Sequence, residues 1–416
     1  MTGPVSTSAP SRWPRTWRPN RLEPTSRGGQ PGHAARRSPA AGRRRRRASE
    51  ARPPPSGRQP AVRTERCERV SPLNTLPSEW QGQAPTPLNP DTAFNGYICA
   101  NVLHGLERLG VFELLRDEKS LDMDRFCETN GLDSAVFRAL VGAAESFGYL
   151  DVRGAQVRAT SVGEDVARYL GFFTWGVGGY HDIFASAAPV ARGERRFGVD
   201  LHRDEGMVAL GSAQADTALM RHILDEEIAG IDFRTLVDLG AGVSERVSRL
   251  VKARPGTRGI GIDISRPATE LARDTVAGYG LAGTVEPVCA DVLDILFNGQ
   301  EIDGGDAADV VMSFMFLHDL LAAPERREEV VPRLRKAFPR AHTFLLADTT
   351  IRPRNEEGDG RLPVFSSGFE LAHALMGVPL HTREEYEELF ERGGMKLRRS
   401  VPFGAPHTYL FVLEAS

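Results

Sequence analysis

The residues best suited to bind a cofactor lie at the ends of apolar runs in the second half of the chain. Residues 237–242 read Val-Asp-Leu-Gly-Ala-Gly, and Asp263 follows Gly242 by 21 residues. A third apolar run ends shortly before Asp291. Glycines such as Gly240 allow a ligand to approach the backbone, and a carboxylate at the end of the next strand can accept hydrogen bonds from ribose hydroxyl groups. The spacing therefore predicts a nucleoside site.

The ligand expected there carries no phosphate. A dinucleotide-binding loop has a third glycine where this chain has Glu245, whose charge would repel a pyrophosphate. Asp238 instead favours a cationic group, such as the methionyl end of S-adenosylmethionine, and Asp291 can accept a hydrogen bond from an adenine amino group. We therefore expect S-adenosylmethionine as the cofactor. The expected binding residues are Asp238, Gly240, Gly242, Asp263, Asp291, Val292 and Ser313.

The elements that must position these residues alternate in type from residue 233 onward. Strands are expected at 235–239, 259–263, 285–289, 308–314 and 343–348, and helices at 244–253, 266–279 and 325–338. This alternation predicts an α/β fold, a Rossmann-like parallel sheet with helices on both faces. The last two runs, 396–402 and 407–413, predict an antiparallel pair. Such a sheet binds ligands at the carboxyl ends of its strands.

Two histidines could serve the reaction itself. His318 directly follows the fourth expected strand and precedes Asp319, and His373 lies 55 residues further on, in an expected helix on the same side of the sheet. Two imidazoles that converge on a pocket are typical metal ligands. His318 alone could instead be a general base, with His373 in a structural role. The residue pattern leaves both interpretations open.

The first half of the chain is expected to form separate units. Residues 1–80, rich in arginine and proline, cannot bury enough apolar surface to fold and are expected to be a disordered extension. Residues 88–170 are expected to form an α-helical, winged-helix-like dimerisation domain. Residues 171–232 are expected to be a helical connector that contributes to the substrate pocket, and residues 233–416 the cofactor-binding domain. Within the first domain, helices are predicted at 94–115, 121–130 and 134–147, and a hairpin at 149–159.

Charge is distributed unevenly along the chain. The net charge is −3, although residues 1–70 carry 17 arginines against four acidic residues, so the remainder is acidic. An acidic body argues against nucleic acid as a partner. The four cysteines have no Cys-x-x-Cys spacing, and no apolar run is long enough to span a membrane. We therefore expect a cytoplasmic protein without membrane contact.

Residues 233–348 resemble a class I S-adenosylmethionine-dependent methyltransferase, and residues 90–416 as a whole resemble the small-molecule O-methyltransferase superfamily. The strand-end His318 and Asp319, the later His373 and the aromatic stretch around Trp175 further resemble iron-dependent C-methyltransferases of 2-oxo acids from nonribosomal peptide pathways. This resemblance implies a homodimer that methylates the β-carbon of a 2-oxo acid of the phenylpyruvate or 4-methyl-2-oxopentanoate type.

The same resemblance assigns roles at the reaction centre. Ferric iron, chelated by the 2-oxo-carboxylate of the substrate, would stabilise an enolate, and either Asp319 or a metal-bound hydroxide would be the base. Trp175 would pack on the substrate. The residues implied are His318, Asp319 and Arg203 for catalysis, Trp175, Met315 and Arg203 for substrate binding, and His318 and His373 for the metal. Arg192, Arg195 and Arg196 compete with Arg203 for the charged end of the substrate.

Two other functions fit parts of the pattern. A metal-free O-methyltransferase acting on a phenol would need only His318, as a general base, because a phenol is far more acidic than a C–H bond. A DNA-binding regulator would use the winged helix together with the arginine run 43–47. The expected helix 134–147 disfavours the regulator, because it carries only Arg138 against Glu145.

Overall fold

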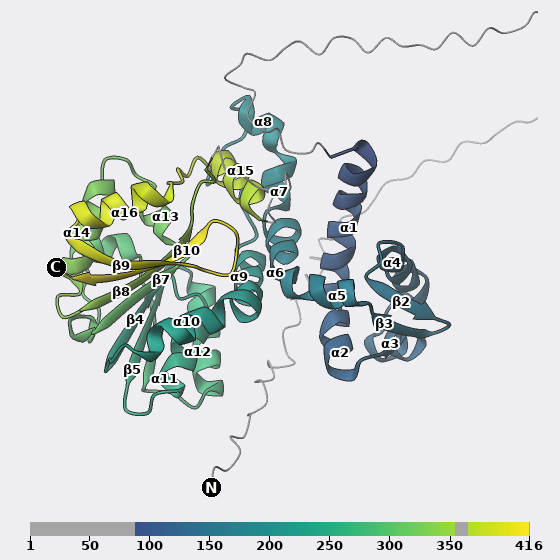
Figure 1. The fold of residues 1–416 in the computed structure, drawn as a ribbon, viewed down its shortest axis with the longest axis horizontal. Helices are drawn as coiled ribbons and strands as arrows, with labels where there is room; N and C mark the ends of the chain where they lie inside the picture. Colours follow the sequence, from purple (N-terminus) through teal and green to yellow (C-terminus); the bar gives the residue numbers. More distant parts are fainter. Residues whose placement is uncertain (1–87, 354–364, 416) are drawn as a thin grey trace, which may run out of the picture. The chain divides into compact units, whose positions relative to one another are not determined.

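The computed structural model describes residues 88–353 and 365–415, so the extension expected over residues 1–80 lies outside the described residues. The largest element is a seven-stranded sheet in the order β6-β5-β4-β7-β8-β10-β9 (Figure 1). Strands β4, β5, β6, β7 and β8 pair in parallel with their neighbours, whereas β10 pairs antiparallel with both β8 and β9. The strands predicted from the sequence are confirmed. Their bounds are β4 Thr235–Leu239, β5 Arg258–Asp263, β6 Val285–Cys289, β7 Val310–Phe314, β8 Thr343–Thr349, β9 Met395–Pro402 and β10 Thr408–Ala415.

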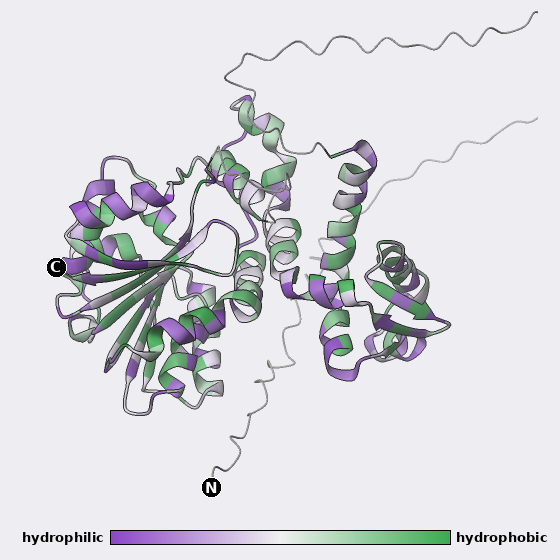
Figure 2. Cartoon of the chain, viewed as in Figure 1, coloured by the Kyte–Doolittle hydropathy of each residue, from purple (hydrophilic) through white to green (hydrophobic). Residues whose placement is uncertain are grey.

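Alternate side chains of the strands face two hydrophobic cores, and helices close both. Val237 and Leu239 belong to a core completed by α14 and α16, whereas Leu236 belongs to a core completed by α10, α11 and α12. Figure 2 shows the strands as largely hydrophobic. Helices therefore cover both faces, as predicted. The helical elements of this part are α10 Arg221–Ala229, α11 Glu245–Lys252, α12 Arg266–Gly278, η5 Asp294–Asn298, η6 Gly305–Ala307, α13 Leu317–Leu320, α14 Arg327–Ala337, α15 Ser366–Met376 and α16 Arg383–Arg392.

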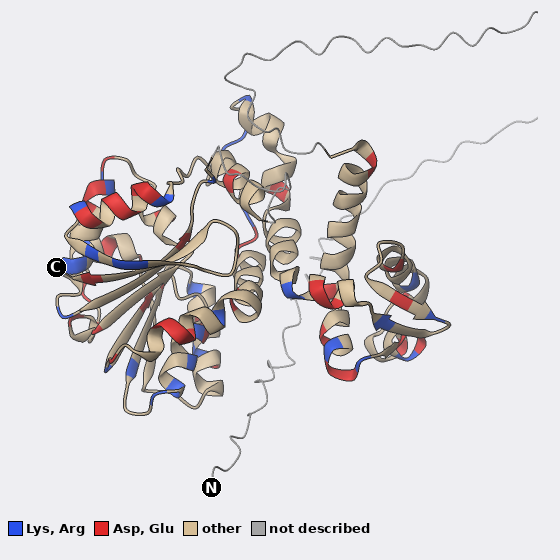
Figure 3. Cartoon of the chain, in the orientation of Figure 1, with Lys and Arg blue, Asp and Glu red and all other residues tan. Residues whose placement is uncertain are grey.

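Charged side chains gather on the outer helices, above all on α14 and α16, and are few on the central strands (Figure 3). The two helices are linked by Arg392 and Glu328, whose Nε and Oε2 atoms lie 3.1 Å apart. Such surface pairs add little stability, so the buried cores hold these helices in place. Within the ranges that the structure describes, no helix has both the length and the apolar content needed to cross a bilayer.

The first described residues form a small unit of helices around a three-stranded sheet. Its elements are α1 Pro90–Arg108, α2 Val111–Glu118, β1 Leu121–Asp122, α3 Met123–Asn130, α4 Ser134–Ser146, β2 Leu150–Arg153 and β3 Gln156–Ala159. The hairpin and the helix predicted at 134–147 are confirmed. The single helix predicted at 94–115 is wrong, because Gly110 adopts a φ of 77° that separates α1 from α2. A winged-helix identity and a role in dimerisation stay predictions.

Short helices connect this unit to the sheet, and two of them are π-helical. They are α5 Ser161–Val166, η2 Ala167–Tyr169, α6 Leu170–Phe173, η3 Thr174–Gly179, α7 His181–Ala185, α8 Ala187–Ala191, α9 Glu205–Ala215 and η4 Asp216–Met220. The π-helical η3 and η4 are of a kind that is frequent at functional sites. Helices α6 and α9 touch through Gly171 and Gly211. A Cβ atom on Gly211 would lie 2.6 Å from the Gly171 carbonyl oxygen and 2.7 Å from the Trp175 nitrogen, so the turn that carries Trp175 is fixed at backbone contact.

Substitution of Gly211 by alanine should be costly. The new methyl group meets backbone on two sides, and overpacking of this kind typically costs about 1–3 kcal/mol. The matched control is Gly142→Ala in α4, where nothing lies within 4 Å of the added Cβ atom. There alanine is expected to add about 0.5–1 kcal/mol of stability. Urea midpoints measure both, and a Gly211→Ala protein as stable as the Gly142→Ala protein would contradict the packing described.

Candidate active site

The predicted cofactor residues gather at one edge of the sheet. The carboxyl ends of β4, β5 and β7 meet where the strand order reverses, between β4 and β7, which is the usual ligand position in an open α/β sheet. Gly240 adopts a φ of 71°, and a Cβ atom there would lie 2.9 Å from the Phe316 ring. Asp263 accepts hydrogen bonds from the backbone nitrogens of Gly242 and Ser265, both at 2.8 Å. These hydrogen bonds hold the Asp263 carboxylate, which is expected to bind ribose, against the glycine loop that follows β4.

Asp238 is the most unusual of these carboxylates. It is completely buried, and neither of its oxygens has a hydrogen-bond partner. Burial raises the pKa of Asp238 to about 7, even though the guanidinium of Arg246 lowers it. The hydroxyl of Ser313 on β7 is also buried without a partner. Unpaired buried acceptors are costly, so these groups suit a polar, cationic ligand that completes them.

Asp291 and Val292 lie just beyond β6, at the same edge. Asp291 Oδ1 accepts a hydrogen bond from the Leu293 nitrogen at 2.8 Å, and Val292 is buried. One oxygen of Asp291 therefore fixes the following turn. The structure brings together all seven residues predicted for the cofactor.

The two predicted histidines face one another, although 55 residues separate them in sequence. His318, in α13, and His373, in α15, are 3% and 1% exposed, and their Nε2 atoms lie 3.1 Å apart. The rings are nearly perpendicular, at 88°. The sequence interpretation that the two imidazoles converge is therefore confirmed, while their function stays open at this point.

Each histidine is oriented by an acceptor behind it. His318 Nδ1 lies 2.8 and 3.0 Å from the two carboxylate oxygens of Asp348, and His373 Nδ1 donates to the Phe369 carbonyl oxygen at 2.7 Å. Both Nδ1 atoms thus carry the proton of the neutral ring. Each neutral ring then presents an Nε2 lone pair to the other, which is repulsive unless a cation lies between them.

A single proton or a metal ion could supply that positive charge. Burial opposes protonation of His318, but the carboxylates of Asp348 and Asp319 outweigh burial and raise its pKa above the ordinary value. For His373, burial and the neighbouring His318 lower the pKa to about 3. Without a metal ion, an additional proton would therefore bind to His318 in preference to His373. With a metal ion bound, both imidazoles would stay neutral and act as ligands.

Among the described residues, no group of three or more His, Cys, Asp or Glu side chains is arranged to hold a metal ion. Asp319 lies beside the pair, with its Oδ2 atom 3.8 Å from His318 Nε2 and about a third of its side chain exposed. It is the described carboxylate that combines closeness to the pair with access to solvent.

Arg203 supplies positive charge near the pair. Its Nη1 atom donates to the Tyr180 hydroxyl at 2.9 Å, and its Nε atom is buried without a partner. Burial lowers the pKa of Arg203, but Tyr180 and Asp319 raise it above its ordinary value, and Arg203 in turn lowers the pKa of His373. Two of the competing arginines have other partners, because the Arg192 guanidinium pairs with Glu194 and that of Arg195 donates to Ser186 and Asp200. Arg196 is anchored to Asp200 through its backbone nitrogen.

Aromatic rings form the wall between Arg203 and the histidines. The Trp175 ring stacks on Tyr180 at 4.0 Å between centroids, and the Phe369 ring lies 4.0 Å from His373. Phe365 lies 5.0 Å from Trp175. Met315 follows β7 with a φ of 55°, rare for a residue with a side chain, and accepts a weak hydrogen bond from Thr349. Trp175 and Met315 thus belong to the residues around the site.

Sequence reasoning missed several residues that the structure places here. Asp348 is the most important, and it ends the fifth expected strand, so the strand-end rule that found Asp238 and Asp263 could have found it. Phe369 gave no such signal, because an aromatic residue at helical spacing is typical of an ordinary core. Tyr180 belongs to the aromatic stretch around Trp175 that the sequence had already indicated as a possible pocket wall. Arg246 was likewise missed.

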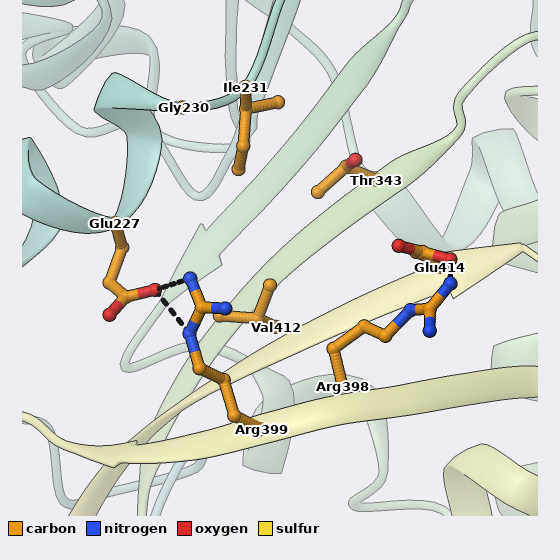
Figure 4. A pocket seen from close by; sticks show the side chains of 8 residues that line it. All are labelled: Glu227, Gly230, Ile231, Thr343, Arg398, Arg399, Val412 and Glu414. Atoms are coloured by element: carbon orange, nitrogen blue, oxygen red, sulfur yellow. Dashed lines mark hydrogen bonds and ion pairs between the residues drawn. The ribbon is translucent and has the colours of Figure 1, made fainter.

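A shallow depression of about 390 Å³ lies elsewhere, between the end of α10 and strands β9 and β10 (Figure 4). Its two arginines are occupied: Arg399 Nε donates to Glu227 at 2.7 Å, and Arg398 pairs with Glu414. It contains none of the residues described above, and we assign no ligand to it.

The chain is similar in sequence to several proteins that are named as methyltransferases. No protein-family model matches it. It is 28% identical over 313 residues to the protein named methyltransferase ungE' from Aspergillus campestris, covering 73% of this chain and 90% of that protein. It is also 28% identical over 334 residues to indolepyruvate C-methyltransferase from Streptomyces griseus, covering 77% and 93%.

Solved structures share the fold at lower identity. Mitomycin 7-O-methyltransferase MmcR matches with a TM-score of 0.54 and 20% identity, over 78% of this chain and 96% of that one. Human N-acetylserotonin methyltransferase in complex with S-adenosylmethionine matches with a TM-score of 0.56 and 18% identity, again over 78% and 96%. Each of these structures corresponds to the described elements nearly from end to end.

Proposed function

We propose that the chain is a class I S-adenosylmethionine-dependent methyltransferase of the small-molecule superfamily, and that it methylates the β-carbon of a 2-oxo acid in natural-product biosynthesis. The observation that carries the proposal is the facing pair of imidazoles, His318 and His373, each with its Nδ1 proton already donated. A hydroxyl acceptor needs one base, whereas the weakly acidic C3–H bond of a 2-oxo acid ionises far more readily when a Lewis acid polarises the adjacent carbonyl group. The similarity to an indolepyruvate C-methyltransferase supports the same acceptor.

The donor set fits a metal ion such as ferric iron. One ion would be held by the Nε2 atoms of both His318 and His373, which face one another at 3.1 Å. Asp348 and the Phe369 carbonyl group fix both tautomers, as outer-shell partners of metal-bound histidines do. When bound, the iron would supply Lewis acidity to a 2-oxo acid and make its C3–H bond more acidic.

The residues of the chain account for the remaining steps. Arg203 would bind the substrate carboxylate, and the Trp175 wall would hold its side chain. Asp319 would accept the C3 proton. The electron pair of that C–H bond would form the new bond to the methyl group, and the S–CH₃ bond would break with its electrons on sulfur, which leaves S-adenosylhomocysteine. A fixed in-line approach supplies much of the remaining rate enhancement.

The second candidate is a metal-free O-methyltransferase, and one observation favours it. The raised pKa of His318, with Asp348 behind it, is also what a general base for a phenol requires. Solved structures of this fold include a mitomycin 7-O-methyltransferase. In that mechanism His373 has no chemical role, which leaves the approach of the two Nε2 atoms unexplained.

Methyl-labelled S-adenosylmethionine separates the two candidates. The purified protein, reconstituted with iron, is incubated with 2-oxo acids and with phenols. Label on C3 of a 2-oxo acid supports the proposal, label on oxygen supports the second candidate, and transfer to neither contradicts both. Chelator treatment should abolish carbon labelling and restored iron should recover it.

Arg203→Met is expected to raise KM for a 2-oxo acid and lower kcat/KM by roughly 10- to 100-fold, because a charge-assisted hydrogen bond is worth about 1.5–3 kcal/mol. The partner of the lost charge is the substrate carboxylate, so binding of S-adenosylmethionine should not change. Arg192→Met is the matched control, since that arginine pairs with Glu194 at the surface. Equal kinetics of the Arg203→Met protein and wild type would refute the role.

A further inference from the structure

A three-membered ionic cluster lies behind the cofactor loop. Arg246, the second residue of α11, donates from Nη2 to Asp216 Oδ1 at 3.0 Å, and its Nη1 atom lies 3.7 Å from Asp238 Oδ2. Its guanidinium also stacks over the Phe314 ring, 3.9 Å from the centroid. The two carboxylates are 4% and 0% exposed. Arg246 thus connects the connector turn η4 to the carboxylate expected to face the cofactor.

The distances show where the charge of Arg246 is used. Asp216 receives two hydrogen bonds, from Nε at 3.3 Å and Nη2 at 3.0 Å, whereas Asp238 receives none and has only the longer ionic contact. The cluster contains two carboxylates and one guanidinium. Arg246 is therefore neutralised mainly by Asp216, and one negative charge remains at Asp238, where both oxygens lack partners.

We propose that Arg246 and Asp216 are positioning residues for the cofactor, which leave one net negative charge at Asp238 to receive the ammonium group of S-adenosylmethionine. Arg246 favours the ionised form of the buried Asp238 carboxylate, and Asp216 prevents Arg246 from neutralising that carboxylate completely. This inference rests on the cofactor assignment but not on whether carbon or oxygen accepts the methyl group.

The cluster also links the cofactor site to the aromatic residues around Trp175 that are expected to contact the substrate. Asp216 begins η4 directly after α9, and Gly211 of α9 is in backbone contact with the Trp175 turn. The charged groups that face Asp238 are Arg246 from α11, Asp216 from η4 and Asp263 from β5. Glu245 is engaged with Arg221 and the Tyr279 hydroxyl group, so it does not compete directly for Arg246 by hydrogen bonding.

The test is the pH dependence of S-adenosylhomocysteine binding, measured by calorimetry between about pH 5.5 and pH 8.5. This probe keeps the ammonium group and needs no catalysis. Since burial raises the pKa of Asp238 to about 7, wild-type affinity should fall as the pH drops through 7, because the protonated acid no longer attracts the cation.

The two variants should move that midpoint in opposite directions. Arg246→Met removes the cation, so the midpoint should rise and affinity at pH 7 should fall roughly tenfold and recover at higher pH. Asp216→Asn frees Arg246 to neutralise Asp238, so the midpoint should fall while affinity stays roughly tenfold weaker above it. A residue that only supports the fold would not give opposite shifts.

The matched control is Arg249→Met, which removes a similar ion pair one turn later on α11, to Asp225 of α10 at 2.5 Å, and should leave the midpoint unchanged. Equal midpoints in wild type and both variants, or shifts in the same direction, would overturn the inference while the cofactor assignment stands. Failure of the wild-type protein to bind S-adenosylhomocysteine would overturn both.

Discussion

His373→Ala is expected to yield protein without bound iron and to lower methyl transfer to a 2-oxo acid by about a thousand-fold or more. The substitution removes one of two nitrogen ligands, and Lewis-acid stabilisation is worth several kcal/mol. His318→Ala should have the same effect, because the two Nε2 atoms face one position. Elemental analysis of the purified proteins and label transfer from S-adenosylmethionine measure the two quantities.

His342→Ala is the control, because that histidine is exposed just before β8 and its imidazole contacts the hydroxyl of its neighbour Thr343, away from the residues of the site. All three variants should bind S-adenosylhomocysteine like wild type, which shows that the fold is intact. The two candidates differ in one variant: an O-methyltransferase would lose activity in His318→Ala and keep it in His373→Ala. Full iron content in either active-site variant would refute the metal site.

Asp348→Asn should lower iron affinity by roughly 10- to 100-fold, as loss of an outer-shell carboxylate typically does. The two oxygens of Asp348 accept hydrogen bonds from His318 Nδ1 and from the backbone nitrogens of His318 and Thr349. An amide has only one oxygen, so its NH₂ group would meet donors, and the His318 ring would lose both its orientation and the nearby charge that raises its pKa.

A second carboxylate controls for lost stability. Asp309 lies at the opposite end of the same sheet and accepts hydrogen bonds from the backbone nitrogens of Arg234 and Thr235 at 2.7 and 2.9 Å. Asp309→Asn should destabilise the sheet without changing iron content or the pH profile of methyl transfer. If both substitutions reduced iron binding equally, the special role of Asp348 would be wrong.

The sheet could be predicted from sequence because its strands are short, buried and separated by helical periodicity, as β4 and β5 illustrate. The break between α1 and α2 could not be predicted with the same ease, since Gly110 within an apolar pattern is compatible with a continuous helix. The π-helical turns η3 and η4 also leave no periodicity of their own. They become apparent only in the folded structure, where α9 packs against the turn that carries Trp175.

The site residues that could be predicted are those that lie at or just after the end of a strand. Asp238, Asp263 and Asp291 follow apolar runs, and His318 follows another, so the topology brings them to one edge. The approach of His373 to His318 depends on how α15 packs against α7 and the turn that carries Trp175, which spacing alone does not fix. The same holds for Arg246, whose partner Asp216 belongs to a different segment of the chain.

The separation of 3.1 Å between the two imidazole nitrogens affects which metal ion the protein is expected to carry after purification. A fixed pair of neutral imidazoles is a poor discriminator between first-row metals, and nitrogen ligands hold divalent nickel and copper more tightly than divalent iron. Protein eluted from immobilised nickel is therefore expected to leave the column with the wrong ion. The bound ion should be removed and iron added back before every assay. Otherwise a lack of activity would reflect the ion acquired during purification and not the chemistry of the site.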